Sequence, residues 1–136
     1  MELKAETLLA GDAVSGACLA LTAPISFWGG VDPASGTIID ARHPERGRNI
    51  AGKILALPGT IGSSSASAVL LELVHAGKAP AALLMDAPDA ILLLGLVVAR
   101  EMGWRTPPAW RLPAADQKTL ADRRINISTE GLITTA

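Results

Sequence analysis

The pattern of apolar and polar positions divides the chain into a strand-rich first half and an alternating second half. In the first half, short apolar stretches are separated by turn signals such as Gly11-Asp12, Ser35-Gly36 and Pro58-Gly59. Apolar stretches of this length, bounded by Gly, Pro and Asp, are typical of short β-strands. The expected strands are Glu6–Leu9, Ser15–Leu21, Thr37–Asp40 and Lys53–Leu57.

The second half of the chain alternates strand and helix patterns. The expected helices are Ser65–His75, which stops at Gly77, and Ala90–Glu101, which Asp89 caps and Gly103 ends. The expected strands are Ala81–Asp86 and two further ones near Trp110–Leu112 and Arg124–Ser128. This order predicts a small parallel βαβ layer, and the earlier strands favour a β-barrel-like or mixed sheet beside it. We therefore expect one α/β domain over residues 1–136.

Composition narrows the class of protein. Of the 136 residues, 49% are hydrophobic and 18% charged, and 12 Lys and Arg balance 13 Asp and Glu. The near-zero net charge argues against a nucleic-acid-binding face, which is normally basic. The single cysteine, Cys18, excludes an internal disulfide and any site built from several cysteines of this chain. Cys18 lies among apolar residues and is expected to be inert core.

The apolar content is high although aromatic residues are few. The mean hydropathy is +0.35 with 3% aromatic residues, so the apolar mass is Ala, Leu, Ile and Val. Two interpretations stay open, an alanine-rich core or a large interface with a partner. The most apolar run, residues 90–99, is too short to span a bilayer, and the first residues lack the order of a signal peptide. We therefore expect a cytoplasmic protein.

The most informative motif joins a strand to a helix over residues 57–67. Gly59 and Gly62 let the backbone approach a ligand closely, and the free N–H groups of the helix's first turn favour an anion. A carboxylate or a phosphate would fit, and the same field would stabilise a serine alkoxide acting as a base. The alternative is that Ser64 or Ser65 only caps the helix. The loop has neither the Gly-Lys-Ser/Thr of a Walker loop nor the Gly-x-Ser-x-Gly of a nucleophile elbow.

A second candidate loop runs from Phe27 to Pro33. Its Gly29-Gly30 pair offers backbone N–H groups and Asp32 offers a carboxylate. The alternative is a tight turn with a packed Trp28.

Four further polar residues have mainly structural interpretations. His43 would contact an acidic substrate, but a solvated basic loop is the commoner arrangement for a histidine flanked by arginines. His75 suits the last turn of a helix, where a cation is favoured. Asp86 and Asp89 are expected to cap the following helix. The sequence offers no metal-ligand constellation and no Ser/His/Asp triad, so the chain alone looks like half of an active site.

Five motifs follow one another along the first half of the chain. They are SFWGGVDP at 26–33, GTIID at 36–40, HP at 43–44, IAGK at 50–53 and GxxGSSSAS at 59–67. Together they resemble the small subunit of aconitase X-type dehydratases, over most of residues 1–105. The resemblance implies a single swivelling β/β/α domain over 1–136. It also implies a large subunit that carries iron or an iron–sulfur cluster and much of the substrate pocket, with no metal bound by this chain alone.

The resemblance also implies roles for individual residues. In aconitases, a Gly-Ser-Ser-Arg loop on the swivelling domain supplies a serine that acts as the catalytic base. The match to Gly62-Ser63-Ser64 implies Ser63 as the base. Ser65 stands in the place of the arginine, which argues against a citrate-like substrate. The implied substrate-binding residues are Gly62, Ser64, Ser65, Gly30 and Asp32.

Two activities are known in this branch of the family. One dehydrates mevalonate 5-phosphate, and the other dehydrates cis-3-hydroxy-L-proline to Δ1-pyrroline-2-carboxylate. The phosphomevalonate enzymes tend to have Gly-Ser-Thr-Val-Gly-Ser in this loop, whereas GSSSAS at 62–67 looks like the hydroxyproline group. The resemblance thus implies the hydroxyproline reaction, with phosphomevalonate as the alternative. A non-enzyme alternative is a swivelling carrier domain phosphorylated on His43.

Overall fold

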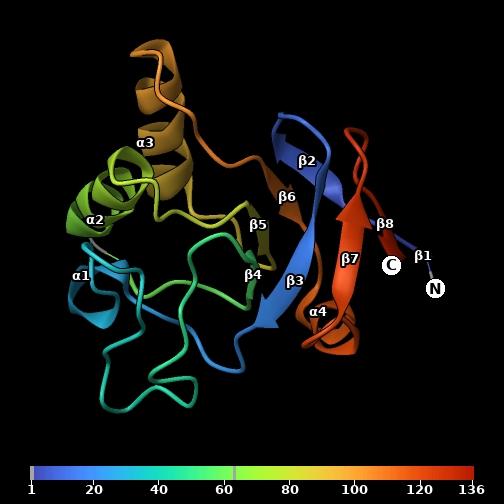
Figure 1. Cartoon of the computed structure of the whole chain (residues 1–136), viewed down its shortest axis with the longest axis horizontal. Coiled ribbons are helices and arrows are strands. Elements are labelled where there is room, and N and C mark those ends of the chain that lie inside the picture. Colours follow the sequence, from blue (N-terminus) through green and yellow to red (C-terminus); the bar gives the residue numbers. More distant parts are fainter. Residues whose placement is uncertain (1, 63) are drawn as a thin grey trace.

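The computed structural model describes residues 2–62 and 64–136, and its strands and helices alternate along most of the chain (Figure 1). The elements are β1 (Glu2–Lys4), β2 (Glu6–Leu9), β3 (Val14–Ala20), α1 (Phe27–Gly30), β4 (Ile54–Leu57), α2 (Ser64–His75), β5 (Ala82–Met85), α3 (Ala90–Glu101), β6 (Ala109–Arg111), α4 (Ala114–Thr119), β7 (Arg124–Ile127) and β8 (Leu132–Thr135).

The strands form one mixed sheet in the order β1-β8-β7-β3-β4-β5-β6-β2. The central strands β3, β4, β5 and β6 run parallel, and the outer pairs are antiparallel. Only Ala5 separates β1 from β2 in the sequence, although they end opposite edges of this order. The sheet therefore curls until its two edges meet. The βαβ layer beside a barrel-like sheet confirms the expected α/β fold class.

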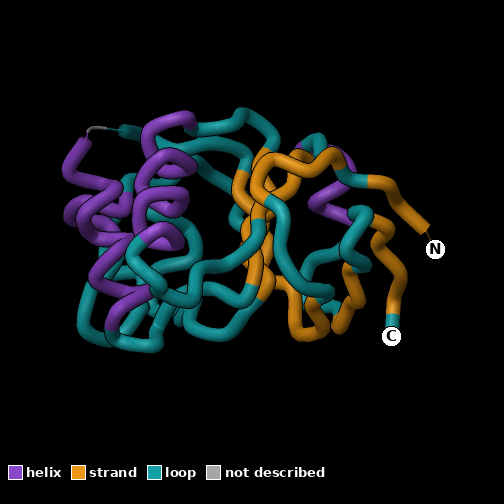
Figure 2. The backbone as a smooth tube through the Cα atoms, turned by 90° about the horizontal axis from the view of Figure 1, so that it is seen from above, coloured by secondary structure: helices purple, strands orange, loops and turns teal. Residues whose placement is uncertain are grey.

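Strand β3 belongs to both parts of the sheet. Its first half, Val14–Ala17, pairs antiparallel with β7, and its second half, Cys18–Ala20, pairs parallel with β4. The parallel crossovers carry α2 and α3 over one face, whereas α4 covers the other (Figure 2). This arrangement leaves the carboxyl ends of β3, β4 and β5 beside the beginnings of α2 and α3.

Side-chain alternation along the parallel strands divides the core in two. Leu55 and Leu57 of β4 face α2 and α3, whereas Ile54 and Ala56 face the barrel interior with Trp110. A strand buried on both faces reads as a continuous apolar run, which is how residues 54–57 and 82–85 appear in the sequence. Among the described residues, no helix combines the length and the apolar character that crossing a bilayer requires.

The structure departs from the expected elements in several places. Thr37–Asp40 is not a strand, because Thr37 bridges to Asn49 while Ile38 bridges to Val31, and neither pairing continues. Each residue meets a different neighbour, so no ladder forms. The segment between the expected strands near Trp110–Leu112 and Arg124–Ser128, where no element is expected, holds the short helix α4, and strands β1 and β8 were not predicted either.

Candidate functional site

The two candidate loops of the sequence lie side by side. Ile25, which precedes α1, forms a parallel bridge with Thr60 in the loop between β4 and α2. The amide of Ile61 donates to the carbonyl oxygen of Ile25 at 3.0 Å, and the amide of Ile25 donates to Gly59 at 3.4 Å. The chain thus adds a short extended contact beyond the end of the sheet, which brings residues 25–30 against the glycine- and serine-rich loop.

A third segment joins this group from the end of β5. The side chain of Asp89 lies beside the loop, where its Oδ2 accepts a hydrogen bond from Thr60 Oγ1 at 2.7 Å. A Cβ atom on Gly62, which is exposed, would lie 3.6 Å from the same oxygen. Loops at the carboxyl ends of parallel strands are the usual place for a ligand site in α/β sheets. The predicted site therefore lies at a typical position.

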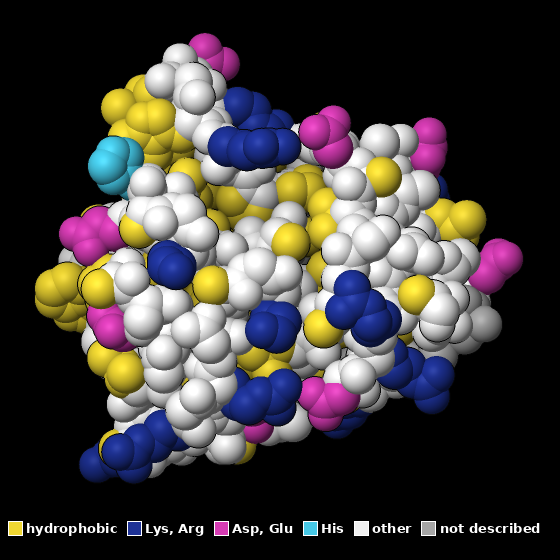
Figure 3. Space-filling model, in the orientation of Figure 1, with side chains coloured by type: hydrophobic (Ala, Val, Ile, Leu, Met, Phe, Trp, Pro, Cys, Tyr) yellow, Lys and Arg dark blue, Asp and Glu magenta, His cyan; other side chains and the backbone are white. Residues whose placement is uncertain are grey.

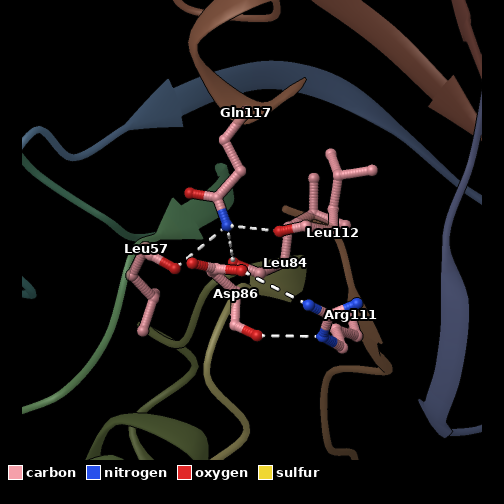
Figure 4. A network of polar contacts seen from close by, with 6 residues as sticks. All are labelled: Leu57, Leu84, Asp86, Arg111, Leu112 and Gln117. Carbon is pink, nitrogen blue, oxygen red and sulfur yellow. Dashed lines mark hydrogen bonds and ion pairs between the residues drawn. The ribbon is translucent and has the colours of Figure 1, made fainter. Parts of the chain in front are cut away.

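Asp89 caps α3, as expected from the sequence. Its Oδ1 accepts hydrogen bonds from the amides of Ile91 at 2.9 Å and Leu92 at 3.2 Å. Asp86 does not cap this helix, which corrects the expectation for that residue. Instead, its carboxylate pairs with Arg111 at 3.5 Å, and its carbonyl oxygen accepts from Arg111 Nε at 3.1 Å (Figure 4).

The implied base and its neighbours are described in part. Ser63 lies outside the described residues. Helix α2 begins at Ser64, directly after it in the sequence, and Ser65 is half-buried in the first turn. The early start of this helix agrees with the expectation that its first turn follows the Gly62 loop.

The second loop holds one irregular helical turn. Trp28 (φ −72°, ψ 114°) and Gly29 (φ +76°) depart from helical angles within α1. Phe27 is fully buried, whereas Trp28 is 62% exposed, so the expectation of a packed Trp28 is wrong. Gly30 is buried, and a Cβ atom there would lie 3.4 Å from the side chain of Ile25. The aromatic anchor of this loop is Phe27.

Asp32 has a structural role within its own turn. Its carboxylate accepts hydrogen bonds from the amide of Ala34 at 3.0 Å and the hydroxyl of Ser35 at 2.8 Å. These two bonds, the amide first, lower the pKa of the Asp32 carboxyl below its ordinary value. Any contact between Asp32 and a substrate would have to share a carboxylate that already holds the turn.

His43 is buried, so the expectation of a solvated loop is wrong at this residue. Its Nε2 lies 3.0 Å from the carbonyl oxygen of Ala23, and its Nδ1 accepts from the amide of Glu45 at 3.1 Å. This pairing fits a neutral ring with the proton on Nε2. Both ring nitrogens are engaged and the side chain is only 6% exposed, so the geometry disfavours a phosphoryl acceptor.

Cys18 is buried in the core, as expected. Burial, and secondarily the charge of Asp122, raises the pKa of its thiol to about 11. In residues 2–62 and 64–136, no three His, Cys, Asp or Glu side chains stand together as a metal site would require. The described part of the chain therefore does not fit an iron group of its own.

Apolar side chains lie exposed around and beyond the candidate site. Helix α3 and its C-cap residue expose a stripe at helical spacing, which consists of Ile91, Leu94, Val98 and Met102. Trp28 and Ile61 are also exposed, on the two candidate loops. Apolar side chains appear over the helical end of the molecule (Figure 3). Exposed apolar residues gathered on one helix are typical of a surface that another protein covers.

Two hollows lie away from this edge of the sheet. The larger, of about 710 Å³, lies at the opposite ends of the parallel strands, beside Arg100 and Trp104. The other, of about 610 Å³, follows the flank of α2 beside His75, whose ring centre lies 5.1 Å from that of Trp104. His75 ends α2, as expected. Among the described residues, none of the predicted substrate contacts lines either hollow, although Pro33, the last residue of the second candidate loop, lines the smaller one.

Comparisons with known proteins identify relatives of the whole chain. The sequence pattern of the aconitase X swivel domain matches residues 2–134. A crystal structure of Thermococcus kodakaraensis aconitase X in its holo-form superimposes with a TM-score of 0.85 and 28% identity, covering 100% of this chain and 98% of that one. The fold is therefore that of an aconitase X swivel structure.

Two curated relatives differ in what they are named for. A cis-3-hydroxy-L-proline dehydratase of Pseudomonas aeruginosa is 52% identical over 102 residues, which are 75% of this chain. This chain spans only 17% of the length of that protein. The phosphomevalonate dehydratase small subunit of Methanothermobacter thermautotrophicus is 42% identical over 84 residues, which are 62% of this chain and 64% of that one.

Proposed function

The chain belongs to the aconitase X swivel-domain family, and from this premise we propose that it is the small subunit of a dehydratase acting on cis-3-hydroxy-L-proline. The observation that carries the proposal is the meeting of three segments at one edge of the sheet, through Ile25, Thr60 and Asp89. They surround the loop that resembles the serine loop of aconitases. The 52% identity to a hydroxyproline dehydratase supports this choice of substrate.

In the proposed reaction, Ser63 removes the proton on the carbon next to the substrate carboxylate. The amides of the first turn of α2 have no acceptor within the helix, so they are suited to stabilise negative charge there. The same field favours a serine alkoxide over the neutral hydroxyl. Loss of this proton and of the 3-hydroxyl group amounts to loss of water and leaves an enamine. The enamine then tautomerises to Δ1-pyrroline-2-carboxylate.

Gly62, Ser64 and Ser65 are the proposed contacts to the substrate from this loop, and Gly30 and Asp32 are those from the second loop. Gly62 suits such a role because it is exposed and lacks a side chain that would hold the substrate away. Gly30 is buried and the Asp32 carboxylate is engaged in its turn, so we assign these two residues the smaller part of the substrate contacts. The proposal therefore places most contacts on the loop before α2.

The proposed enzyme is completed by a large aconitase X subunit. Helix α3 and the two candidate loops expose apolar side chains that a partner would cover. The described residues offer no metal site, so we assign the iron or iron–sulfur group of the proposed enzyme to the large subunit. This chain would then supply the base and one wall of the pocket, as a single swivelling domain over 1–136.

Dehydration of mevalonate 5-phosphate is the second candidate function. Its supporting observation is that this chain matches a separate small subunit of a phosphomevalonate dehydratase over 64% of that subunit's length. A phosphate-bearing acid also suits the amides at a helix N-terminus. The two candidates share the loop and the partner and differ in the substrate alone.

One experiment tests both candidates. The chain is co-purified with its large subunit, loaded with iron without oxygen, and given each substrate in turn. Ser63→Ala is compared with Ser15→Ala, a serine at the opposite end of β3 whose hydroxyl donates to Asn126 at 2.7 Å. We expect turnover of cis-3-hydroxy-L-proline that collapses only in Ser63→Ala, with the complex still formed. Turnover of mevalonate 5-phosphate alone would reject the first candidate in favour of the second.

A further inference from the structure

We propose that Thr60 and Asp89 are positioning residues that fix the loop of the base against the first turn of α3. This inference rests on the proposed function, because that function makes Ser63 the residue being positioned. Neither side chain is assigned to the substrate, because each is already engaged with the other. Their contact joins the end of β4 to the end of β5, two segments that are 29 residues apart in the chain.

The carboxylate of Asp89 is divided between two tasks. Its Oδ1 accepts from the amides of Ile91 and Leu92, which is the helix cap. Its Oδ2 accepts from Thr60 Oγ1 at 2.7 Å. A cap needs only one oxygen, and a serine caps a helix about as well as an aspartate does. The second oxygen, and the longer reach of aspartate, are therefore available to hold the loop.

A second contact closes the other end of the same loop. The hydroxyl of Ser67, one turn into α2, donates to the carbonyl oxygen of Ile91 at 3.0 Å. The Thr60–Asp89 and Ser67–Ile91 contacts both end at the start of α3, so Thr60 before the loop of the implied base and Ser67 after it are each held to that helix. On the near side, Ile61 is also held by the carbonyl oxygen of Ile25. The loop of the implied base is thereby tied to the rigid layer at both ends.

The expected functional consequence is on the rate of the chemical step. A displacement of about 1 Å in a reacting group costs on the order of 100-fold in rate. Loss of the Thr60–Asp89 contact releases the near end of the loop from α3 and leaves it held by the backbone bond between Ile61 and Ile25. We therefore expect a fall of about 10-fold in kcat with little change in KM. If Asp89 served only to cap α3, no such fall in kcat would be expected, because α3 keeps its cap in the variants below.

Four variants of the iron-loaded complex separate positioning from capping. Thr60→Val removes the hydroxyl and keeps the branched shape, and Thr60→Ser restores a hydroxyl. Asp89→Ser keeps a helix cap but is too short to reach Thr60. Asp86→Asn is the control, because this carboxylate lies on the same connection and pairs with Arg111. We expect about 10-fold lower kcat in Thr60→Val and Asp89→Ser, and kcat within about threefold of wild type in Thr60→Ser and Asp86→Asn.

Amide hydrogen exchange of the full chain gives a readout that does not depend on the substrate. We expect faster exchange at the amide of Ile61, which donates to Ile25, in Thr60→Val and Asp89→Ser, with the middle of α3 unchanged. The double variant should fall no further in kcat than the lower single variant, because both remove one contact.

The outcomes distinguish the positioning role of Thr60 and Asp89 from the proposed function of the chain. Unchanged exchange and unchanged kcat in Thr60→Val would overturn the positioning role. Faster exchange in a complex whose wild type turns over neither substrate would support the positioning role and reject the proposed function.

Discussion

The side-chain amide of Gln117 donates to the carbonyl oxygen of Leu57 at 3.0 Å and so ties α4 to the last residue of β4 (Figure 4). The same nitrogen donates to Leu112 at 2.9 Å and lies 3.5 Å from the carbonyl oxygen of Leu84. Gln117 is 2% exposed, so these bonds form away from water. One buried amide thus joins the carboxyl-terminal halves of β4 and β5 to Leu112, the residue that follows β6.

Replacement of Gln117 should destabilise the fold, and by an amount that depends on the new side chain. Gln117→Leu leaves buried carbonyl groups unpaired, and we expect it to lower the free energy of unfolding by about 1–3 kcal/mol. Gln117→Glu should cost more at neutral pH, because an ionised carboxylate would face carbonyl oxygens. Urea unfolding measures both, with the exposed neighbour in Lys118→Gln as the control, expected within about 0.5 kcal/mol of wild type. Equal stability of all three variants would contradict the bridging role.

Gly131 and Gly47 form a matched pair for a second prediction. Both have φ +91°, but a Cβ atom on Gly131 would overlap the carbonyl oxygen of Ala5 and lie 3.1 Å from Trp110, whereas nothing lies within 4 Å at Gly47. Gly47→Ala should lower the free energy of unfolding by about 1–2 kcal/mol, because alanine is strained in this backbone conformation. Gly131→Ala should cost about 1–3 kcal/mol more, because the backbone between β1 and β2 must move. Thermal or urea unfolding of the two variants checks the difference. Equal losses of stability would show that the overlap with Ala5 does not destabilise Gly131→Ala.

The crossing of α2 and α3 provides a third prediction. A Cβ atom on Gly95 would overlap the hydroxyl oxygen of Ser67, which donates to Ile91. In Gly95→Ala, the lost hydrogen bond, worth about 1 kcal/mol, offsets the gain in helix propensity of about the same size. In a Ser67→Ala background the overlap is gone, so Gly95→Ala should raise the free energy of unfolding by about 0.5–1 kcal/mol. A double-mutant cycle measures this coupling, and additive effects would refute it.

Much of the fold follows from local signals in the sequence. Asp89, Gly77 and Gly103 act within a few residues of the helix ends that they set, which is why α2 and α3 were predicted almost to the residue. Helix α4 carries no such pattern, because its one buried side chain is the polar Gln117. Two of the carbonyl groups that meet Gln117, those of Leu57 and Leu84, belong to distant strands, which a local pattern does not contain.

The candidate site, too, was predicted only where its signals are local in the sequence. The loop over 57–67 was recognised because strand, glycines and helix are consecutive in the sequence. Its contacts with Ile25 and Asp89 were not predicted, because they depend on how the strands are ordered in the sheet. The burial of His43 was missed for the same reason, since its partner Ala23 lies 20 residues away. The Thr60 hydroxyl carried no signal in the sequence beyond its place between two glycines.

The apolar stripe of α3 allows a direct test of the proposed partner surface. Leu94 is 64% exposed in the middle of the stripe, so Leu94→Glu should leave the stability of the chain within about 0.5 kcal/mol of wild type. The same change should weaken binding to the large subunit by at least about 10-fold, because a charge would be buried without a partner. Leu132→Glu is the control, since Leu132 is 40% exposed on β8, on the opposite side of the molecule from α3 (Figure 1). Calorimetry with the large subunit measures both, and unchanged binding of Leu94→Glu would place the interface elsewhere.

Cys18 gives the fold a dependence on alkaline pH. Its thiol has a pKa of about 11 in the folded chain, against the ordinary value of 9.0, because burial disfavours the thiolate. Between these two values the unfolded chain has lost the proton while the folded chain keeps it. The contribution of the Cys18 thiol to the free energy of unfolding is therefore fully present below pH 9. It falls as the pH rises to about 11, by at most about 1.4 kcal/mol for each pH unit. The chain has no tyrosine, so no phenol titrates in the same window.

Urea unfolding of wild type and Cys18→Ala at pH 8, 9 and 10 checks this dependence. The lysines titrate alike in the two proteins, so the difference between their free energies of unfolding isolates the thiol. We expect that difference to be constant from pH 8 to below 9 and to shrink at pH 10, because only wild type loses stability through Cys18. Asp122→Asn should reduce the effect, since the charge of Asp122 also raises the pKa of the thiol. Parallel pH curves for wild type and Cys18→Ala would show that the folded core does not hold this thiol protonated.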